Sequence, residues 1–201
     1  LTRADILRQL HIEQARTFLS SFDRPNISLA VETGLTGRAK VQRIARFIAA
    51  HPRQSGIVYC LRRADTEAMA SALTSLGIRA EAFHAQMPTA LKQAVQRAFV
   101  RDELPVICAT VAFGMGIDKS NVRWVIHANM PKNIESYYQE IGRAGRDGLP
   151  ADALMLYSLS DVIALRRMAG ESAQAVLNIE KLQRMQQFAE AGVCRRRILL
   201  N

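Results

Sequence analysis

Residues 56–85 read GIVYCLRRADTEAMASALTSLGIRAEAFHA, and the pattern of this stretch decides the fold class. Gly56–Cys60 is a short apolar run of the kind that forms a buried strand. Ala64–Leu76 then carries apolar residues at helical spacing, and Arg79–His84 returns to a strand pattern. Strand, helix and strand in this order predict a βαβ unit with two parallel strands.

The same alternation continues towards the C-terminus. Pro88 suits the first turn of a helix, and strand patterns follow at Pro105–Thr110, Val122–Ala128 and Ala153–Ser158. We therefore expect an α/β domain of three layers, in which helices flank a mainly parallel sheet. Such sheets bind ligands at the carboxyl ends of their strands, so one functional edge should carry the loops after Cys60, His84, Thr110 and Ala128. Each motif described below, the arginine motif included, is expected to fall on or just after one of these loops.

Helices are expected outside this central region as well. Residues 1–17 form a lead-in that begins with a short capped helix, and Ala39–Ala50 has apolar residues on one helical face. Val176–Ala189 predicts a long amphipathic helix that is ended by Gly192, and Cys194–Asn201 opens a further helix. We expect a lobe over residues 1–168 and a C-terminal helical appendage over residues 169–201.

The composition favours a polyanion as partner. The chain has 201 residues, of which 49% are hydrophobic, and this is enough for one well-packed core. A net charge of +9 and a pI near 10.1 are typical of proteins that bind nucleic acids or nucleotides, although a basic protein that its charge merely keeps dispersed has the same composition. No stretch is long and apolar enough to span a membrane, so we expect neither a membrane-spanning segment nor a signal peptide in this sequence. Leu1 and Asn201 read as cut ends, so we expect a piece of a longer protein.

The three cysteines, Cys60, Cys108 and Cys194, are odd in number, widely spaced and without a Cys-x-x-Cys pair. This argues against a disulfide framework and for a reducing cytoplasm. Cys60 and Cys108 lie at the ends of apolar runs, so both are expected to be buried structural residues.

The strongest chemical signal is QEIGRAGRDG at residues 139–148, where two arginines stand three residues apart between glycines. A helix is expected over Pro131–Gly145, and if the turn that carries these arginines is helical, Gln139, Arg143 and Arg146 occupy one face. Each guanidinium binds phosphate oxygens in a bidentate manner and stays charged at physiological pH, so the pair suits a polyphosphate. The alternative is an arginine-rich helical turn that makes only surface salt bridges.

A second signal, ATVAFGMGIDK at residues 109–119, follows a strand. Its glycines, Gly116 among them, let backbone amides turn towards a ligand. Asp118 is suited to accept hydrogen bonds from ribose hydroxyls, and Thr110 offers a hydroxyl to a nucleic-acid phosphate. The alternative is a tight turn in which Asp118 caps the next element.

These two stretches resemble motifs VI and V of helicase superfamily 2, in the form found in the RecQ family of DNA helicases. The resemblance implies a RecA-like fold. It also implies that Arg143 and Arg146 reach the terminal phosphate of ATP held by a different lobe, with Arg146 the preferred arginine finger. Gln139, Gly116 and Asp118 would then contact the nucleotide. In that family the motif V stretch touches both DNA and nucleotide.

Two further stretches resemble nucleic-acid-binding segments of the same family. The residues after the first strand resemble motif IV, with Arg62 where members often have serine, so Arg62 and Arg63 are expected to contact the DNA backbone; a solvated charge pair at a helix start is the alternative. The stretch after the second strand resembles one in which His84 contacts phosphate or orders the loop, with Gln86 in place of the usual glycine. A histidine that only satisfies local backbone groups is the alternative.

Both ends of the chain also resemble that family. Phe22–Asn26 matches the start of this lobe and is assigned no chemistry. Cys194 resembles the first of four zinc-binding cysteines in the zinc subdomain of that family. A structural zinc needs four ligands. The other ligands would lie beyond Asn201, so zinc is expected in the full-length protein and not in this chain.

The sequence lacks the Walker loop Gly-x-x-x-x-Gly-Lys-Ser/Thr and the Asp-Glu box that holds magnesium. In the RecQ family both belong to the first RecA-like lobe. The resemblance therefore implies the C-terminal motor lobe of an ATP-dependent 3′-to-5′ DNA helicase of the bacterial cytoplasm, associated with the nucleoid. This lobe would grip single-stranded or duplex DNA, while the first lobe of the same polypeptide holds ATP and Mg²⁺. The chain alone is expected to be inactive as an ATP hydrolase.

Two other functions stay open. An RNA helicase lobe of the same superfamily differs in contacts to the 2′-hydroxyl, which a sequence does not reveal. A non-catalytic module, kept as a docking surface for nucleic acid or protein, would explain the missing Walker loop.

Overall fold

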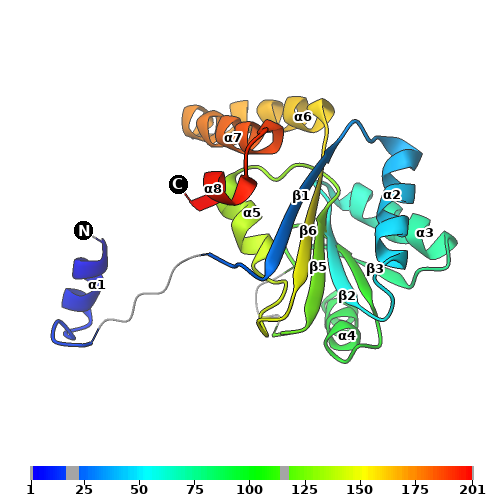
Figure 1. Cartoon of the computed structure of the whole chain (residues 1–201), viewed down its shortest axis with the longest axis horizontal. Helices are drawn as coiled ribbons and strands as arrows, with labels where there is room; N and C mark the ends of the chain where they lie inside the picture. Colours follow the sequence, from blue (N-terminus) through cyan, green and yellow to red (C-terminus); the bar gives the residue numbers. More distant parts are fainter. Residues whose placement is uncertain (1, 17–22, 114–117, 201) are drawn as a thin grey trace.

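A six-stranded parallel sheet forms the centre of the molecule (Figure 1). The computed structural model describes residues 2–16, 23–113 and 118–200. In sheet order the strands are β1 (Ile27–Thr33), β6 (Ala151–Tyr157), β5 (Val122–His127), β2 (Ser55–Tyr59), β4 (Val106–Ala109) and β3 (Ala80–Phe83). Every adjacent pair is parallel. The α/β class is confirmed, and the five strands expected from apolar runs are present within two residues of their expected bounds.

Helices cover both faces of the sheet, which confirms the expected three layers (Figure 1). On one face lie α2 (Gly37–Ala49) and α3 (Arg63–Ser75); on the other lie α4 (Thr89–Val100) and α5 (Ile134–Ile141). The sheet serves two cores because side chains alternate along each strand. In β2, Ile57 and Tyr59 join the core under α4 and α5, whereas Val58, with Cys60 just after the strand, joins the core under α2 and α3.

The C-terminal helices pack onto the lobe. They are α6 (Leu159–Gly170), α7 (Ala175–Glu190) and α8 (Arg195–Leu200). Leu182, Met185 and Phe188 of α7 are buried in the same core as α5, so the expected amphipathic helix and its apolar face are confirmed. The expected boundary between residues 168 and 169 falls within α6 and stays a prediction. The short helix of the lead-in is α1 (Thr2–Gln9).

Tight packing across the sheet involves Trp124, which is fully buried. A Cβ atom at Gly56 would lie 2.1 Å from the Trp124 ring, so only glycine fits at this point of β2. Cys60 and Cys108 are buried and unpaired, as expected for structural residues. Burial raises the pKa of the Cys60 thiol to about 12, which keeps it protonated and inert. Among the described residues, no helix has the length and apolar character needed to cross a bilayer.

The helix expected over Pro131–Gly145 is shorter than predicted. It begins after the cap Asn133, whose side chain accepts a hydrogen bond from the Ser136 amide at 2.7 Å, and it ends at Ile141. Gly145 has φ +58°, a left-handed conformation that breaks a helix and favours glycine. Its amide donates to the carbonyl of Val122 at 2.8 Å instead of to the preceding helical turn. The chain therefore leaves the helix inside the arginine motif.

Candidate nucleotide and nucleic-acid sites

The arginine motif lies at the opposite edge of the sheet from the one we expected. Helix α5 runs from the carboxyl ends of the strands back to the beginning of β5 (Figure 1). There, residues 142–149, called the arginine loop below, bond to the segment that leads into β5. The Gly145 amide donates to Val122 and the Asp147 amide donates to Ser120 at 3.3 Å. The expectation that this motif shares the carboxyl edge with the other loops is thus wrong, because α5 is long enough to return the chain across the sheet.

The three polar residues of the motif do not share one helical face either. Gln139 lies within α5 and is exposed, whereas Arg143 follows the helix and is half-buried. Arg146 lies beyond the left-handed Gly145 and is exposed. The spacing argument failed because it assumed a continuous helix through Gly142 and Gly145. Both arginines nevertheless belong to one short loop.

Residues 110–113 and 118–122, together called the linking segment below, share hydrogen bonds with the arginine loop directly or through Tyr59; Gly116, one of our expected nucleotide contacts, lies outside the described residues. The Tyr59 hydroxyl connects the two. It donates to the carbonyl of Phe113 at 3.1 Å and accepts a hydrogen bond from the Arg143 guanidinium. Burial raises the pKa of Tyr59, and the positive charge of Arg143 only partly opposes this shift, so the phenol stays neutral.

Asp118, the other expected nucleotide contact in this segment, is exposed next to a buried anchor. Its neighbour Lys119 is 4% exposed and donates to the carboxylate of Asp102 at 2.6 Å. Asp102 accepts a second hydrogen bond from Asn121 at 3.4 Å. This hydrogen bonding from Lys119 lowers the pKa of Asp102. The backbone on the C-terminal side of Asp118 is therefore held in place while its carboxylate faces solvent.

Arg123, which lies outside the arginine motif, binds the C-terminal end of the arginine loop. Arg123 of β5 donates to both carboxylate oxygens of Asp147, at 2.6 and 2.7 Å, and to the carbonyl of Pro150 at 3.0 Å. Both bonds to Asp147 come from Nη2 of Arg123, and this hydrogen bonding lowers the pKa of Asp147. The sequence analysis did not identify Arg123, because it lies inside a strand pattern and its partner is more than twenty residues away.

The expected nucleic-acid-binding residues converge at the carboxyl edge. A pocket with a volume of about 580 Å³ is lined by Leu61, Arg62, Arg63, Ala64, Glu67, His84, Gln86 and Thr110. These residues come from the loops after β2, β3 and β4 and from the first turn of α3. All four residues that we expected to contact nucleic acid, Arg62, Arg63, His84 and Thr110, are therefore brought together, as parallel strands predict. Their contact with nucleic acid stays a prediction.

The side chains of this nucleic-acid pocket differ in their exposure to solvent and in their hydrogen bonds. Arg62 is the N-cap of α3, and both Arg62 and Arg63 are exposed. His84 is only 7% exposed, and its Nε2 lies 2.9 Å from a carboxylate oxygen of Glu67. The Thr110 hydroxyl oxygen accepts from the Ala112 amide at 3.4 Å. The arginines are thus placed to meet a ligand directly, while His84 supports the wall of the pocket.

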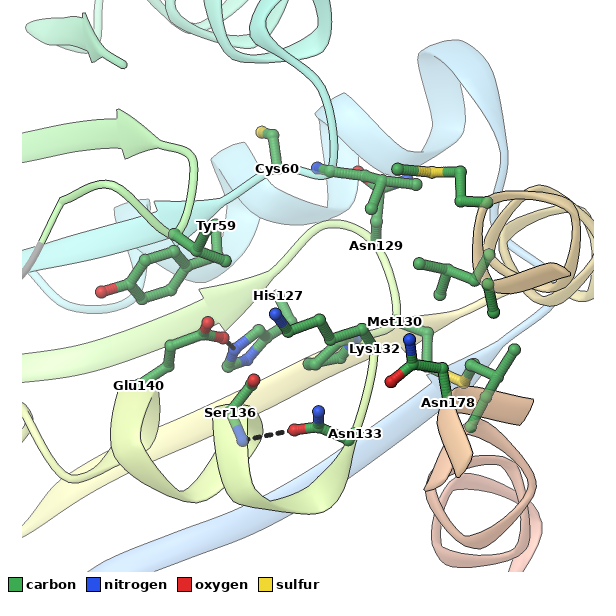
Figure 2. A pocket seen from close by; sticks show the side chains of 17 residues that line it. Tyr59, Cys60, His127, Asn129, Met130, Lys132, Asn133, Ser136, Glu140 and Asn178 are labelled. Carbon is green, nitrogen blue, oxygen red and sulfur yellow. Dashed lines mark hydrogen bonds and ion pairs between the residues drawn. The ribbon is translucent and has the colours of Figure 1, made fainter. Parts of the chain in front are cut away.

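A third feature, which sequence reasoning missed, is a pocket of about 390 Å³ beside α5 and α7 (Figure 2). Buried His127 and Glu140 form its polar wall, with Nε2 and the carboxylate 2.7 Å apart. Tyr59 stacks on the imidazole with ring centroids 5.4 Å apart. His127 stands in an apolar strand pattern, so no local signal marked it. Asn129, at the mouth, is oriented by a hydrogen bond to Asp161 at 2.9 Å.

The described residues contain no group of three His, Cys, Asp or Glu side chains that could hold a metal ion. Cys194 is exposed at the start of α8, where the backbone amides of Arg197 and Arg196 lower the pKa of its thiol. A thiolate at this position suits a metal ligand. One thiolate does not make a zinc site, however, and the described residues of this chain do not fit Mg²⁺ or zinc by themselves.

Known proteins resemble this chain in sequence and in fold. Residues 39–148 match the family described as "Helicase conserved C-terminal domain". The chain is 45% identical over 204 residues to ATP-dependent DNA helicase RecQ of Pasteurella multocida (strain Pm70), a match that covers 100% of this chain and 32% of that protein. It is 36% identical over 199 residues to ATP-dependent DNA helicase RecQ of Bacillus subtilis (strain 168), covering 98% of this chain and 33% of that protein. The chain thus spans about a third of the length of these curated relatives.

Solved structures support the fold. A DEAD box protein from Methanococcus jannaschii superposes with a TM-score of 0.60 at 26% identity, covering 71% of this chain and 40% of that one. The E. coli DEAD-box protein SrmB, bound to regulator of ribonuclease activity A, superposes with a TM-score of 0.61 at 20% identity, covering 78% of this chain and 84% of that one. The second match concerns the fold alone. Together they agree with the RecA-like architecture that the motifs implied.

Proposed function

Because this chain belongs to the helicase conserved C-terminal domain family, in its RecQ form, we propose that it is the C-terminal motor lobe of an ATP-dependent 3′-to-5′ DNA helicase. In the complete protein it supplies Arg143 and Arg146 to ATP bound by a first lobe, and it grips the backbone of single-stranded DNA. The names of the RecQ relatives, ATP-dependent DNA helicases, support both the nucleotide and the nucleic acid.

One observation carries this proposal: the linking segment touches both sites. At its beginning, Thr110 lines the nucleic-acid pocket. Further on, the Phe113 carbonyl accepts from the same Tyr59 hydroxyl that Arg143 contacts. At its end, the carbonyls of Ser120 and Val122 accept hydrogen bonds from the arginine loop. The hydrogen bonds from Arg143 to Tyr59 and from Tyr59 to Phe113 therefore connect the nucleotide arginines with the part of the linking segment that lines the nucleic-acid pocket.

At the nucleotide site, this chain contributes two positively charged guanidinium groups on a loop whose backbone is fixed by hydrogen bonds. Arg143 and Arg146 stabilise the charge that develops on the transferred phosphoryl group, with Arg146 as the finger because it is exposed at the tip of the arginine loop. Asp118 and Gln139, both exposed, bind the ribose and the phosphates, together with Gly116. The first lobe holds ATP and Mg²⁺, since the described residues of this lobe offer no acidic cluster suited to the metal.

At the nucleic-acid pocket, Arg62 and Arg63 bind backbone phosphates and Thr110 adds a hydroxyl donor. Arg62 caps α3 without a side-chain hydrogen bond to the first-turn amides, so these amides can also serve a phosphate at the start of this helix. Residues 169–201 begin a zinc subdomain, in which Cys194 is the first of four ligands in the longer protein.

The experiment is an Arg146→Ala substitution in the full-length protein. We expect DNA-stimulated ATP hydrolysis to fall by about 10³-fold to 10⁵-fold, as for other arginine fingers, while the Kd for single-stranded DNA stays the same. Arg43→Ala, which removes a surface pair between α2 and Glu32, is the matched control and should leave both quantities unchanged. Normal hydrolysis combined with lost DNA binding would show that the role of Arg146 has been misassigned.

A second experiment with the full-length protein tests whether DNA or RNA is its substrate. Its ATP hydrolysis and strand separation are measured on matched substrates with DNA or RNA overhangs. We expect stronger stimulation by DNA. Tighter binding to RNA that is lost on removal of the 2′-hydroxyls would instead support an RNA helicase.

A further inference from the structure

The turn that precedes β1, residues 23–26, lies against the arginine loop although about 120 residues separate them in sequence. The Arg24 guanidinium donates to three carbonyls of that loop: Gly142 at 3.3 Å, Ala144 at 2.9 Å and Gly145 at 2.7 Å. These carbonyls lie just beyond the end of α5, where the helix dipole favours a cation. One planar guanidinium therefore fixes the backbone on both sides of Arg143.

Asn26 completes this contact on the other side of Arg146. Its Nδ2 donates to the carbonyls of Gly145 and Leu149, each at 2.9 Å. Its Oδ1 accepts from Arg24 Nε at 3.4 Å, which sets the orientation of the amide. The carbonyls that bracket Arg146 are thus bound by side chains of the same turn.

The turn is itself held by α8. Arg196 donates to the carboxylate of Asp23 at 2.5 Å, to the carbonyl of Arg24 at 2.8 Å and to the carbonyl of Ile27 at 2.6 Å. Asp23 and Arg196 are both half-buried, so solvent screens these bonds only partly. A continuous set of bonds consequently runs from the C-terminal helix through the turn to the arginine loop.

We propose that Arg24 is a positioning residue for ATP hydrolysis: it holds the arginine loop in the conformation that presents Arg143 and Arg146 to the nucleotide, and Arg196 holds Arg24. This inference rests on the proposed function of the two arginines. The loop needs such a support because Gly142 and Gly145 give its backbone many alternatives. A displacement of about 1 Å at a catalytic group can lower a rate about 100-fold.

The test uses Arg24→Ala and Arg24→Lys in the full-length protein, with Arg43→Ala as control. For Arg24→Ala we expect kcat for DNA-stimulated ATP hydrolysis to fall by about 30-fold to 100-fold, with KM for ATP and the Kd for single-stranded DNA within about threefold of the parent. Arg24→Lys keeps the charge but cannot bind three carbonyls at once, so it should restore part of kcat. A parallel fall of kcat, DNA affinity and melting temperature in both variants would mean that Arg24 only stabilises the fold, and would overturn the proposal.

A double-mutant cycle separates this inference from the proposed function. Because Arg24 acts through both arginines, adding Arg24→Ala to the combined variant Arg143→Ala with Arg146→Ala should change hydrolysis by less than about twofold. Fully multiplicative losses would overturn the proposal, as would an unchanged kcat in Arg24→Ala. If neither Arg143→Ala nor Arg146→Ala affects hydrolysis, the proposed function itself fails. Arg196→Ala should give the same pattern as Arg24→Ala with a smaller loss of kcat; an unchanged kcat there would remove α8 from the mechanism.

Discussion

The arginine loop and the nucleic-acid pocket both offer two arginines to phosphates, but the structure holds them in different ways. In the arginine loop, bonds from the turn before β1, from β5 and from the segment that leads into β5 fix the main chain around Arg143 and Arg146. In the nucleic-acid pocket, Arg62 and Arg63 extend from the first turn of α3 into solvent.

This difference fits two tasks. Charge stabilisation in a transition state needs donors placed in advance, because reorganisation at the moment of reaction costs rate. A groove that tracks a moving polyanion needs charge, but its side chains must release one phosphate and take the next. Substitutions should therefore act on the arginine loop through geometry and on the nucleic-acid pocket through charge.

Among the substitutions that test this difference, the largest effect is expected from one that leaves the net charge unchanged, Gly145→Ala. Its Cβ would lie 2.8 Å from the carbonyl of Leu149 and 2.5 Å from the Asn26 amide, so the loop must move, and φ +58° is unfavourable for alanine. We expect DNA-stimulated ATP hydrolysis by the full-length protein to fall about 100-fold, with unchanged affinity for single-stranded DNA.

Gly148→Ala is the matched control for this prediction. Gly148 also has a positive φ, +82°, but nothing lies within 4 Å of the position that a Cβ atom would take there. The conformational strain is thus shared and only the displacement differs. We expect Gly148→Ala to retain most of the hydrolysis rate, and equal losses in the two variants would show that strain rather than displacement matters.

A smaller effect is expected in the nucleic-acid pocket, where the affinity for DNA should change and ATP hydrolysis should not. In the full-length protein, Arg62→Ala with Arg63→Ala should weaken binding of single-stranded DNA by about tenfold at moderate salt. The slope of log K against log salt should become shallower by about 0.7 for each charge removed. ATP hydrolysis at saturating DNA should stay the same, because the arginine loop is not touched.

Removing charge elsewhere tests whether position matters. Arg166→Ala with Arg167→Ala deletes two adjacent exposed arginines from α6, outside the nucleic-acid pocket. This control lowers the net charge by the same amount. If it weakens DNA binding and reduces the salt slope as much as the pocket variant does, the chain binds DNA through its overall charge and not through the pocket.

Much of the fold could be predicted because buried parallel strands leave an apolar run in the sequence. β1 was not identified as a strand for the converse reason. It lies at the edge of the sheet, where Ser28, Ala30 and Thr33 are exposed, so its pattern is mixed. The convergence of Arg62, His84 and Thr110 followed from topology alone, since parallel strands bring their carboxyl ends to one edge.

The arginine loop shows what local sequence cannot supply. The spacing of Gln139, Arg143 and Arg146 suggested one helical face, but the left-handed Gly145 and its bond to Val122 decide otherwise. Arg24 carried no local signal, because its partners lie about 120 residues away in the chain. Contacts of this kind become visible only when the tertiary structure places the turn before β1 beside the end of α5.

The smallest effect is expected at the far end of the arginine loop, from Arg123→Ala. This change removes the ion pair with Asp147 and the bond to Pro150, but it leaves the bonds of Arg24 and Asn26 around Arg146 intact. Pairs near the surface contribute little, so we expect kcat for ATP hydrolysis to fall by only about twofold.

The pH dependence of this last variant follows from Asp147. Arg123 lowers the pKa of that carboxyl, so the pair stabilises the loop above the ordinary aspartate pKa of about 3.9 and loses its effect only as the pH falls through the lowered value. The ratio of parent to variant kcat should therefore be constant from about pH 6 to pH 9. If kcat in Arg123→Ala falls as much as in Arg24→Ala, both ends of the arginine loop position the arginines equally. The inference that the bonds of Arg24 and Asn26 matter more than those of Arg123 would then be wrong.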